Sequence, residues 1–73
     1  MSYLPVISGD ECVKALQKIG FNLKCQRGSN IILRRDNPFC QVVVPNHKTI
    51  DRGTLTGILK TVGISVDYLK SLL

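Results

Sequence analysis

The sequence contains no tryptophan and only two tyrosines and two phenylalanines among its 73 residues. A protein that stacks single-stranded bases needs several aromatic faces, so this composition argues against such a platform. No apolar run approaches the ~20 residues of a membrane-spanning helix. The N-terminal stretch MSYLPVIS lacks the charged and apolar regions of a signal peptide. We therefore expect a cytoplasmic protein that has no membrane partner.

Cysteine is scarce and widely spaced. Cys12, Cys25 and Cys40 are odd in number, and no CxxC pair occurs. This pattern disfavours a disulfide framework and a zinc site, and we expect all three thiols to be small core residues. The only histidine is His47. Cys40 is expected to point inward, away from His47, which argues against a thiolate nucleophile. We expect no metal and no small-molecule cofactor.

Positive charge, in contrast, is in excess. Ten Lys and Arg residues face five Asp and Glu residues, and the formal net charge is +5. Such a chain suits a polyanion, because neutralised phosphates release counterions; the alternative is a solvated basic surface without a ligand. The length predicts one domain over residues 1–73. A domain of this size buries roughly 60% of its unfolded surface, which leaves a thin core and little room for a deep pocket.

Three segments carry helix signals. The residues SGDE at 8–11 form a capping box, and the apolar spacing that follows predicts a helix over 9–19. Asp51 is expected to be the N-cap of a second, clearly amphipathic helix that Gly63 ends. Ser65 is expected to cap a short last helix.

Alternating residues between the first two helices predict three strands. They cover residues 21–26, 30–35 and 40–44, with a break at Gly28 and a turn at 36–39. The order α-β-β-β-α predicts an α+β fold, a three-stranded antiparallel sheet with helices packed on one face.

The turn at 36–39 also predicts which residues pair. If Arg35 opposes Cys40, then four aliphatic side chains share the face toward the helices: Ile31, Leu33, Val42 and Val44. The other face is then open and carries Lys24, Gln26, Asn30, Ile32, Arg34, Gln41 and Val43. The same register brings Arg27, Asn30 and His47 together at one end of the sheet.

Four motifs resemble one family. They are GF at 20–21, RGSN at 27–30, VPNH at 44–47 and IDRGTLTGILKTVGIS at 50–65, and they resemble the HicA (YcfA-like) toxins. The resemblance runs from about residue 8 to the C-terminus. It implies a fold like the double-stranded-RNA-binding domain and the activity of an mRNA interferase, a metal-independent endoribonuclease. It also implies inhibition by a cognate HicB-like antitoxin.

The family motif reads Gly-Ser-His, and its histidine is the catalytic residue. Here Gly28 and Ser29 match, and Asn30 occupies the histidine position. Asparagine donates and accepts hydrogen bonds but does not titrate, and the loss of a general base costs ~10²–10⁴ in rate. We therefore predict a chain that folds and binds RNA but cleaves it weakly or not at all. Asn30 is either a substitution for a histidine or the native residue of a degenerate toxin, or of one that uses another base.

Other residues are candidates around this position. His47 is either an assisting catalytic residue or a polar loop residue. Arg27 and Arg34 are expected to lie nearest Asn30 on the open face, and Lys48 and Arg52 flank a helix start that attracts phosphate. The expected RNA-binding set is Lys24, Arg27, Gly28, Ser29, Arg34, Lys48 and Arg52, with Arg35 and Lys60 as further basic candidates.

Two other classes of function remain open. The same frame could serve as a non-catalytic RNA-binding module. It could also be a protein-interaction module whose open face, with Ile32 and Val43, docks a HicB-like partner.

Overall fold

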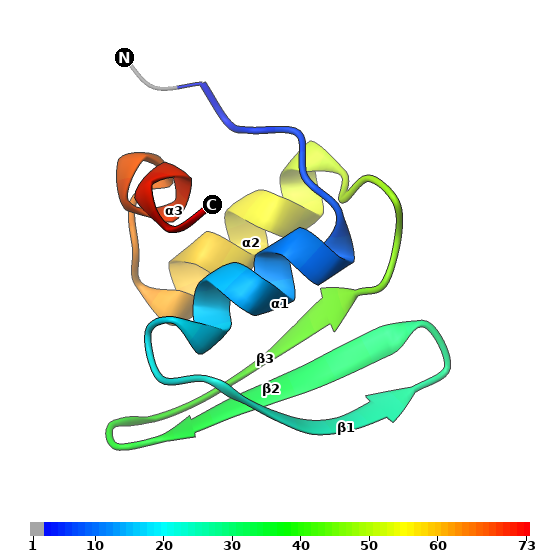
Figure 1. Ribbon diagram of the computed structural model, residues 1–73, viewed down its shortest axis with the longest axis vertical. Coiled ribbons are helices and arrows are strands. Elements are labelled where there is room, and N and C mark those ends of the chain that lie inside the picture. The colour runs from blue at the N-terminus through cyan, green and yellow to red at the C-terminus, as the bar shows by residue number, and fades with distance from the viewer. Residues whose placement is uncertain (1–2) are drawn as a thin grey trace.

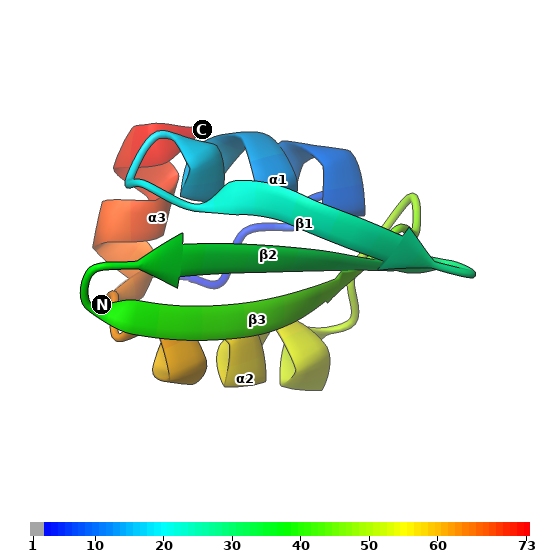
Figure 2. The same cartoon turned by 90° about the horizontal axis from the view of Figure 1, so that it is seen from below.

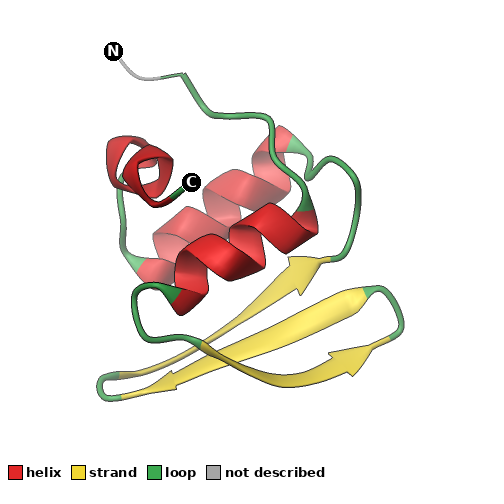
Figure 3. Cartoon of the chain, viewed as in Figure 1, coloured by secondary structure: helices red, strands yellow, loops and turns green. Residues whose placement is uncertain are grey.

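The computed structural model describes residues 3–73 as an open antiparallel sheet whose one face is covered by helices (Figures 1 and 3). The elements are α1 (Gly9–Gln17), β1 (Asn22–Arg27), β2 (Asn30–Asp36), β3 (Phe39–Pro45), α2 (Arg52–Val62) and α3 (Val66–Leu72). The strand order is β1-β2-β3. The predicted α+β fold and its α-β-β-β-α order are confirmed, with element bounds that agree within two residues.

Two expectations concern the chain as a whole, the lack of a signal peptide and the lack of a membrane span. The stretch considered for a signal peptide includes Met1 and Ser2, which lie outside the described residues. Within residues 3–73, none of the helices combines the length and the apolar character that crossing a membrane requires.

The helices begin where their predicted N-caps stand. The Ser8 hydroxyl accepts from the Glu11 backbone N–H at 3.1 Å, and the Glu11 carboxylate accepts from the Ser8 N–H at 3.0 Å, which completes the capping box. Asp51 and Ser65 each accept from the backbone N–H three residues on. Gly63 ends α2 with φ of 83°, a left-handed conformation that glycine adopts without a steric penalty.

The predicted register of β2 and β3 is confirmed. The pairs are Arg35 with Cys40, Leu33 with Val42 and Ile31 with Val44. Because paired residues share one face of a sheet, the four aliphatic side chains lie toward the helices, and all four are buried.

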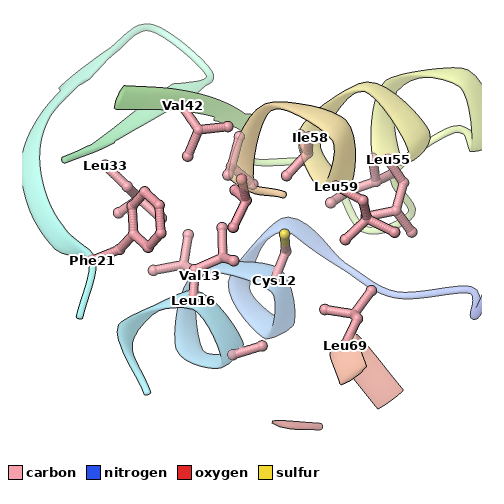
Figure 4. Close-up of a cluster of buried hydrophobic side chains, with 14 of the residues drawn as sticks. Cys12, Val13, Leu16, Phe21, Leu33, Val42, Leu55, Ile58, Leu59 and Leu69 are labelled. Atoms are coloured by element: carbon pink, nitrogen blue, oxygen red, sulfur yellow. The ribbon is translucent and has the colours of Figure 1, made fainter. Parts of the chain in front are cut away.

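The core lies between this face and the helices (Figure 4). Phe21, Leu16, Leu33, Leu55 and Leu69 are fully buried, so the sheet and all three helices contribute to it. Among residues 3–73, no polar or charged residue is buried. The hydrophobic effect therefore stabilises the sheet–helix interface without any buried ion pair that would need compensation.

The first strand departs from the predicted alternation because it contains a β-bulge. Leu23 pairs with Leu33, but Cys25 pairs with Ile32, so the register shifts between them. Cys25 therefore shares the open face with Ile32, and Gln26 turns to the helix side; both placements are opposite to the prediction. An extra residue in one strand reverses every later side chain, and simple alternation does not reveal it.

One close backbone contact fixes α1 against the end of β3. The Gly9 N–H donates to the His47 carbonyl at 2.8 Å. A Cβ atom at Gly9 would overlap the Pro45 carbonyl oxygen and would lie 2.9 Å from the Asn46 Cα. Only glycine allows this approach, and the loop that carries His47 is positioned by it.

Candidate nucleic-acid interface and catalytic position

The RGSN segment forms a tight hairpin turn. Arg27 pairs with Asn30, so Gly28 and Ser29 are the two residues of the turn. Gly28 has φ of 59°, and glycine at the first central position is what a type II′ turn requires. The Gln26 side-chain amide donates to the Gly28 carbonyl at 3.2 Å and braces the turn.

The turn is also bonded to the end of β3. The Asn46 backbone N–H donates to the Ser29 carbonyl at 2.6 Å, and Asn30 pairs with Pro45. His47 follows two residues after Pro45, and its carbonyl accepts from Gly9. The turn, the end of β3 and the start of α1 therefore meet at one corner. Sequence reasoning missed the bracing roles of Gln26 and Asn46, because neither bond follows from residue spacing.

Asn30 occupies the first position of β2 at this corner. Its side chain is exposed, and it shares the open face of the sheet with Arg27 opposite and Ile32 further along the strand. Figure 2 shows this face toward the viewer, with the helices behind the sheet. Asn30 is therefore accessible from the open face without entry into a pocket.

Arg34 lies farther from Asn30 than Arg27 does. Arg34 follows Asn30 by four residue steps along β2, which corresponds to about 13 Å. The Arg34 Nε also forms an ion pair with the Asp36 carboxylate at 3.0 Å. The Asp36 side chain is largely exposed and the Arg34 side chain is partly exposed, so this pair weakens the availability of Arg34 for phosphate without abolishing it.

Two further basic residues lie on opposite sides of the sheet. The Lys24 ammonium group donates to the Gln41 side chain of β3 at 3.4 Å, so it crosses the open face as predicted. Arg35 instead lies on the helix side. Its guanidinium sits 4.9 Å from the centre of the Phe21 ring, and its Nε donates to the Pro38 carbonyl at 3.1 Å. Arg35 is therefore not part of the open basic face.

The start of α2 already holds a carboxylate. Asp51 accepts from the Thr54 hydroxyl and from the Thr54 N–H at 3.1 Å, and these hydrogen bonds lower the pKa of the Asp51 carboxyl. The free N–H groups expected to attract a phosphate are thus partly occupied by the protein itself. Lys48 and Arg52 flank this end, are exposed, and form no ion pair with any carboxylate of residues 3–73.

The thiols differ in environment, and none is paired with another. Cys12 is a core residue as predicted, and burial raises the pKa of its thiol to about 11. Cys40 is half-buried and its thiol lies 3.5 Å from the Thr61 carbonyl. Cys25 is half-buried on the open face, which corrects its expected place in the core. In the part of the chain that the structure describes, no three His, Cys, Asp or Glu side chains gather as metal ligands would.

Comparison with known proteins identifies the family of the chain. No curated protein matches the chain significantly. Residues 9–64 match the family described as HicA toxin of bacterial toxin-antitoxin. The matched range begins at the first residue of α1, includes the Gly28–Ser29 turn and Asn30, and ends just after α2. On this match over most of its length, the chain belongs to the HicA toxin family.

Proposed function

We propose that this toxin is an mRNA interferase in which Asn30 stands at the position of the general base, so that it binds RNA but cleaves it weakly or not at all. The observation that carries the proposal is the corner itself. Asn30 is exposed beside Arg27, on a turn that is braced from two sides. We place this action in the cytoplasm, where mRNA is translated.

The chemistry explains why the residue at position 30 matters. In metal-independent cleavage, the 2′-oxygen of the ribose loses its proton and attacks the adjacent phosphorus. The bond from phosphorus to the 5′-oxygen breaks, and that oxygen takes up a proton. Histidine serves such transfers because its pKa lies near neutral pH. The Asn30 amide can hydrogen-bond to the phosphate or the 2′-hydroxyl but cannot accept the proton.

The basic side chains around Asn30 bind the phosphates of the RNA. Arg27 stands directly opposite Asn30, and Lys24 extends over the same face. Lys48 and Arg52 extend the positive surface toward the start of α2. Each phosphate that these side chains neutralise would release counterions, so the affinity should fall steeply as salt is added.

The partner that we propose is a HicB-like antitoxin that covers the open face. This face is not purely polar, because Ile32 is half-buried and Val43 is 47% exposed. An antitoxin that buries these apolar side chains would also cover Asn30. Inhibition would then follow from occlusion of the RNA path.

A second candidate function is a non-catalytic RNA-binding module on the same frame. Asn30 favours it, since the only histidine, His47, lies in the loop after β3 and its backbone is used to hold α1. In this case the toxin would act by holding transcripts. The two candidates differ in whether a histidine at position 30 produces RNA cleavage.

The test compares RNA cleavage by three proteins in the presence of EDTA. They are the parent chain, Asn30→His, and the matched control Asn22→His. Asn22 is also exposed and lies opposite Arg34 at the other end of β1, so the control adds a histidine away from the corner. We expect cleavage at least ~10²-fold faster for Asn30→His than for the other two. Equal, fast cleavage by all three would contradict the role of position 30, and no cleavage by any would favour the binding module.

A further inference from the structure

The two edges of the sheet are protected unequally. β1 is an edge strand with a bulge between Leu23 and Cys25 and with two cations, Lys24 and Arg27. Bulges and charged side chains are the devices by which proteins prevent another strand from pairing at an edge. The β1 edge is therefore protected against pairing with another strand.

The edge formed by β3 has none of these devices along most of its length. Its pairing with β2 continues without a shift from Pro45 to Phe39. Its sequence, FCQVVVP, contains no charged residue, and proline occurs only at its last position. A regular, uncharged edge strand of seven residues offers its backbone N–H and C=O groups to a further strand.

A groove runs beside this edge, between β3 and α2. Its volume is about 300 Å³, and Gln41 and Val43 of β3 and Thr54, Gly57 and Thr61 of α2 contribute to its walls. A Cβ atom at Gly57 would meet no atom within 4 Å, so the helix wall is open there. In Figure 2, α2 extends beyond β3 on the side away from β2. A strand placed at the usual ~4.8 Å from β3 would lie over these small side chains.

Three cations, Lys48, Arg52 and Lys60, outweigh the Asp51 carboxylate that is bonded to Thr54 of the groove, so the charges favour an acidic occupant. The Cys40 thiol contacts the Thr61 carbonyl, so α2 runs antiparallel to β3. Lys60 therefore lies near the beginning of β3, and Lys48 and Arg52 lie near its end. A second copy of this chain, also with a net charge of +5, would bring like charges together.

We propose that the β3 edge and the groove beside it bind an extended acidic segment of a partner protein, which adds as a fourth strand of the sheet. Backbone hydrogen bonds to β3 would supply much of the affinity, and alternate side chains of the segment would fill the groove next to Gly57. The groove is lined by residues other than those of the Asn30 corner, but the β3 edge ends at Pro45, which pairs with Asn30, and Lys48 and Arg52 belong to both surfaces. Binding of the segment does not itself require RNA cleavage.

The probe is a fluorescent, end-capped peptide, Glu-Glu-Val-Thr-Val-Thr-Val-Glu-Glu, whose binding is measured by anisotropy. Two control peptides accompany it: one carries Lys in place of Glu, and the other is N-methylated at the five central amides. Two protein variants test the groove. Gly57→Gln fills it, and Thr56→Gln places the same side chain on an exposed position of α2 that does not line it. Circular dichroism confirms that both variants are folded.

We expect the acidic peptide to bind the parent chain and the Thr56→Gln variant alike. Binding should weaken at least tenfold with Gly57→Gln, with N-methylation and with the Lys peptide. Absence of binding, equal binding of the N-methylated peptide, or an unchanged affinity of Gly57→Gln would each overturn the proposal. A dimer detected by sedimentation and disrupted by Gly57→Gln would also overturn the proposal, because a second copy of the chain would then occupy the edge. No RNA is present, so the outcome is independent of the test of cleavage.

Discussion

Replacement of Gly9 by alanine should destabilise the fold, although alanine is the better helix former. The added Cβ would overlap the Pro45 carbonyl oxygen and lie 2.9 Å from the Asn46 Cα and 3.1 Å from the Pro45 carbonyl carbon. All three are backbone atoms, so no side chain can rotate away. The start of α1 must move outward, and this movement stretches the 2.8 Å hydrogen bond from the Gly9 N–H to the His47 carbonyl.

The size of the effect follows from these contacts. An overpacked contact costs about 1–3 kcal/mol, and loss of a backbone hydrogen bond costs about 0.5–1.5 kcal/mol. The intrinsic preference of a helix for alanine offsets about 0.5–1 kcal/mol of that sum. We therefore expect the free energy of unfolding to fall by about 0.5–4 kcal/mol.

The assay is urea unfolding followed by circular dichroism, with Gly57→Ala as the matched control. Gly57 lies inside α2, and an added Cβ meets no atom within 4 Å, so this variant should gain about 0.5–1 kcal/mol. If Gly9→Ala is as stable as the parent, or is stabilised like the control, the close approach of α1 to β3 is incorrect.

Three further predictions test the basic face, the helix cap and the buried thiol. Arg27→Glu should weaken the binding of a labelled RNA and flatten its salt dependence, measured by anisotropy at several KCl concentrations; an unchanged slope would move the interface elsewhere. The pKa of Asp51 is lowered in the folded state, so its stabilising effect is present above about pH 4 and is lost as the pH falls through the folded pKa. The stability advantage of the parent over Asp51→Ala should therefore be larger at pH 7 than at pH 2 in urea unfolding, and equal advantages would contradict the cap. Burial raises the pKa of the Cys12 thiol to about 11, so at pH 8 iodoacetamide should alkylate it only after unfolding, as read by peptide mass spectrometry; rapid labelling of the folded chain would contradict its burial.

Local signals in the sequence were enough to predict much of this fold. Ser8, Asp51 and Ser65 satisfy helix N–H groups within three residues of themselves, so each cap could be recognised without knowledge of the rest of the chain. The register of β2 and β3 was also predictable, because a short turn joins them and a slip of one residue would expose the aliphatic face.

Features that depend on distant segments were not predictable. The bulge in β1 left the alternating pattern of Leu23 and Cys25 intact in the sequence while it turned Cys25 to the other face. The approach of Gly9 to Pro45 joins α1 to β3 across much of the chain. At the candidate site, the proximity of Arg27 and Asn30 was predicted from the sheet register, whereas their direct pairing and the bond between Asn46 and Ser29 needed the structure.

The pH dependence of RNA cleavage by Asn30→His, measured in EDTA beside the parent chain, tests the role of position 30 most directly. If histidine acts there as the general base, the rate should rise with pH until the imidazole is neutral, near pH ~6.5, while the parent stays slow at every pH. If the parent and the variant cleave RNA at the same rate and with the same pH profile, proton transfer does not take place at this corner.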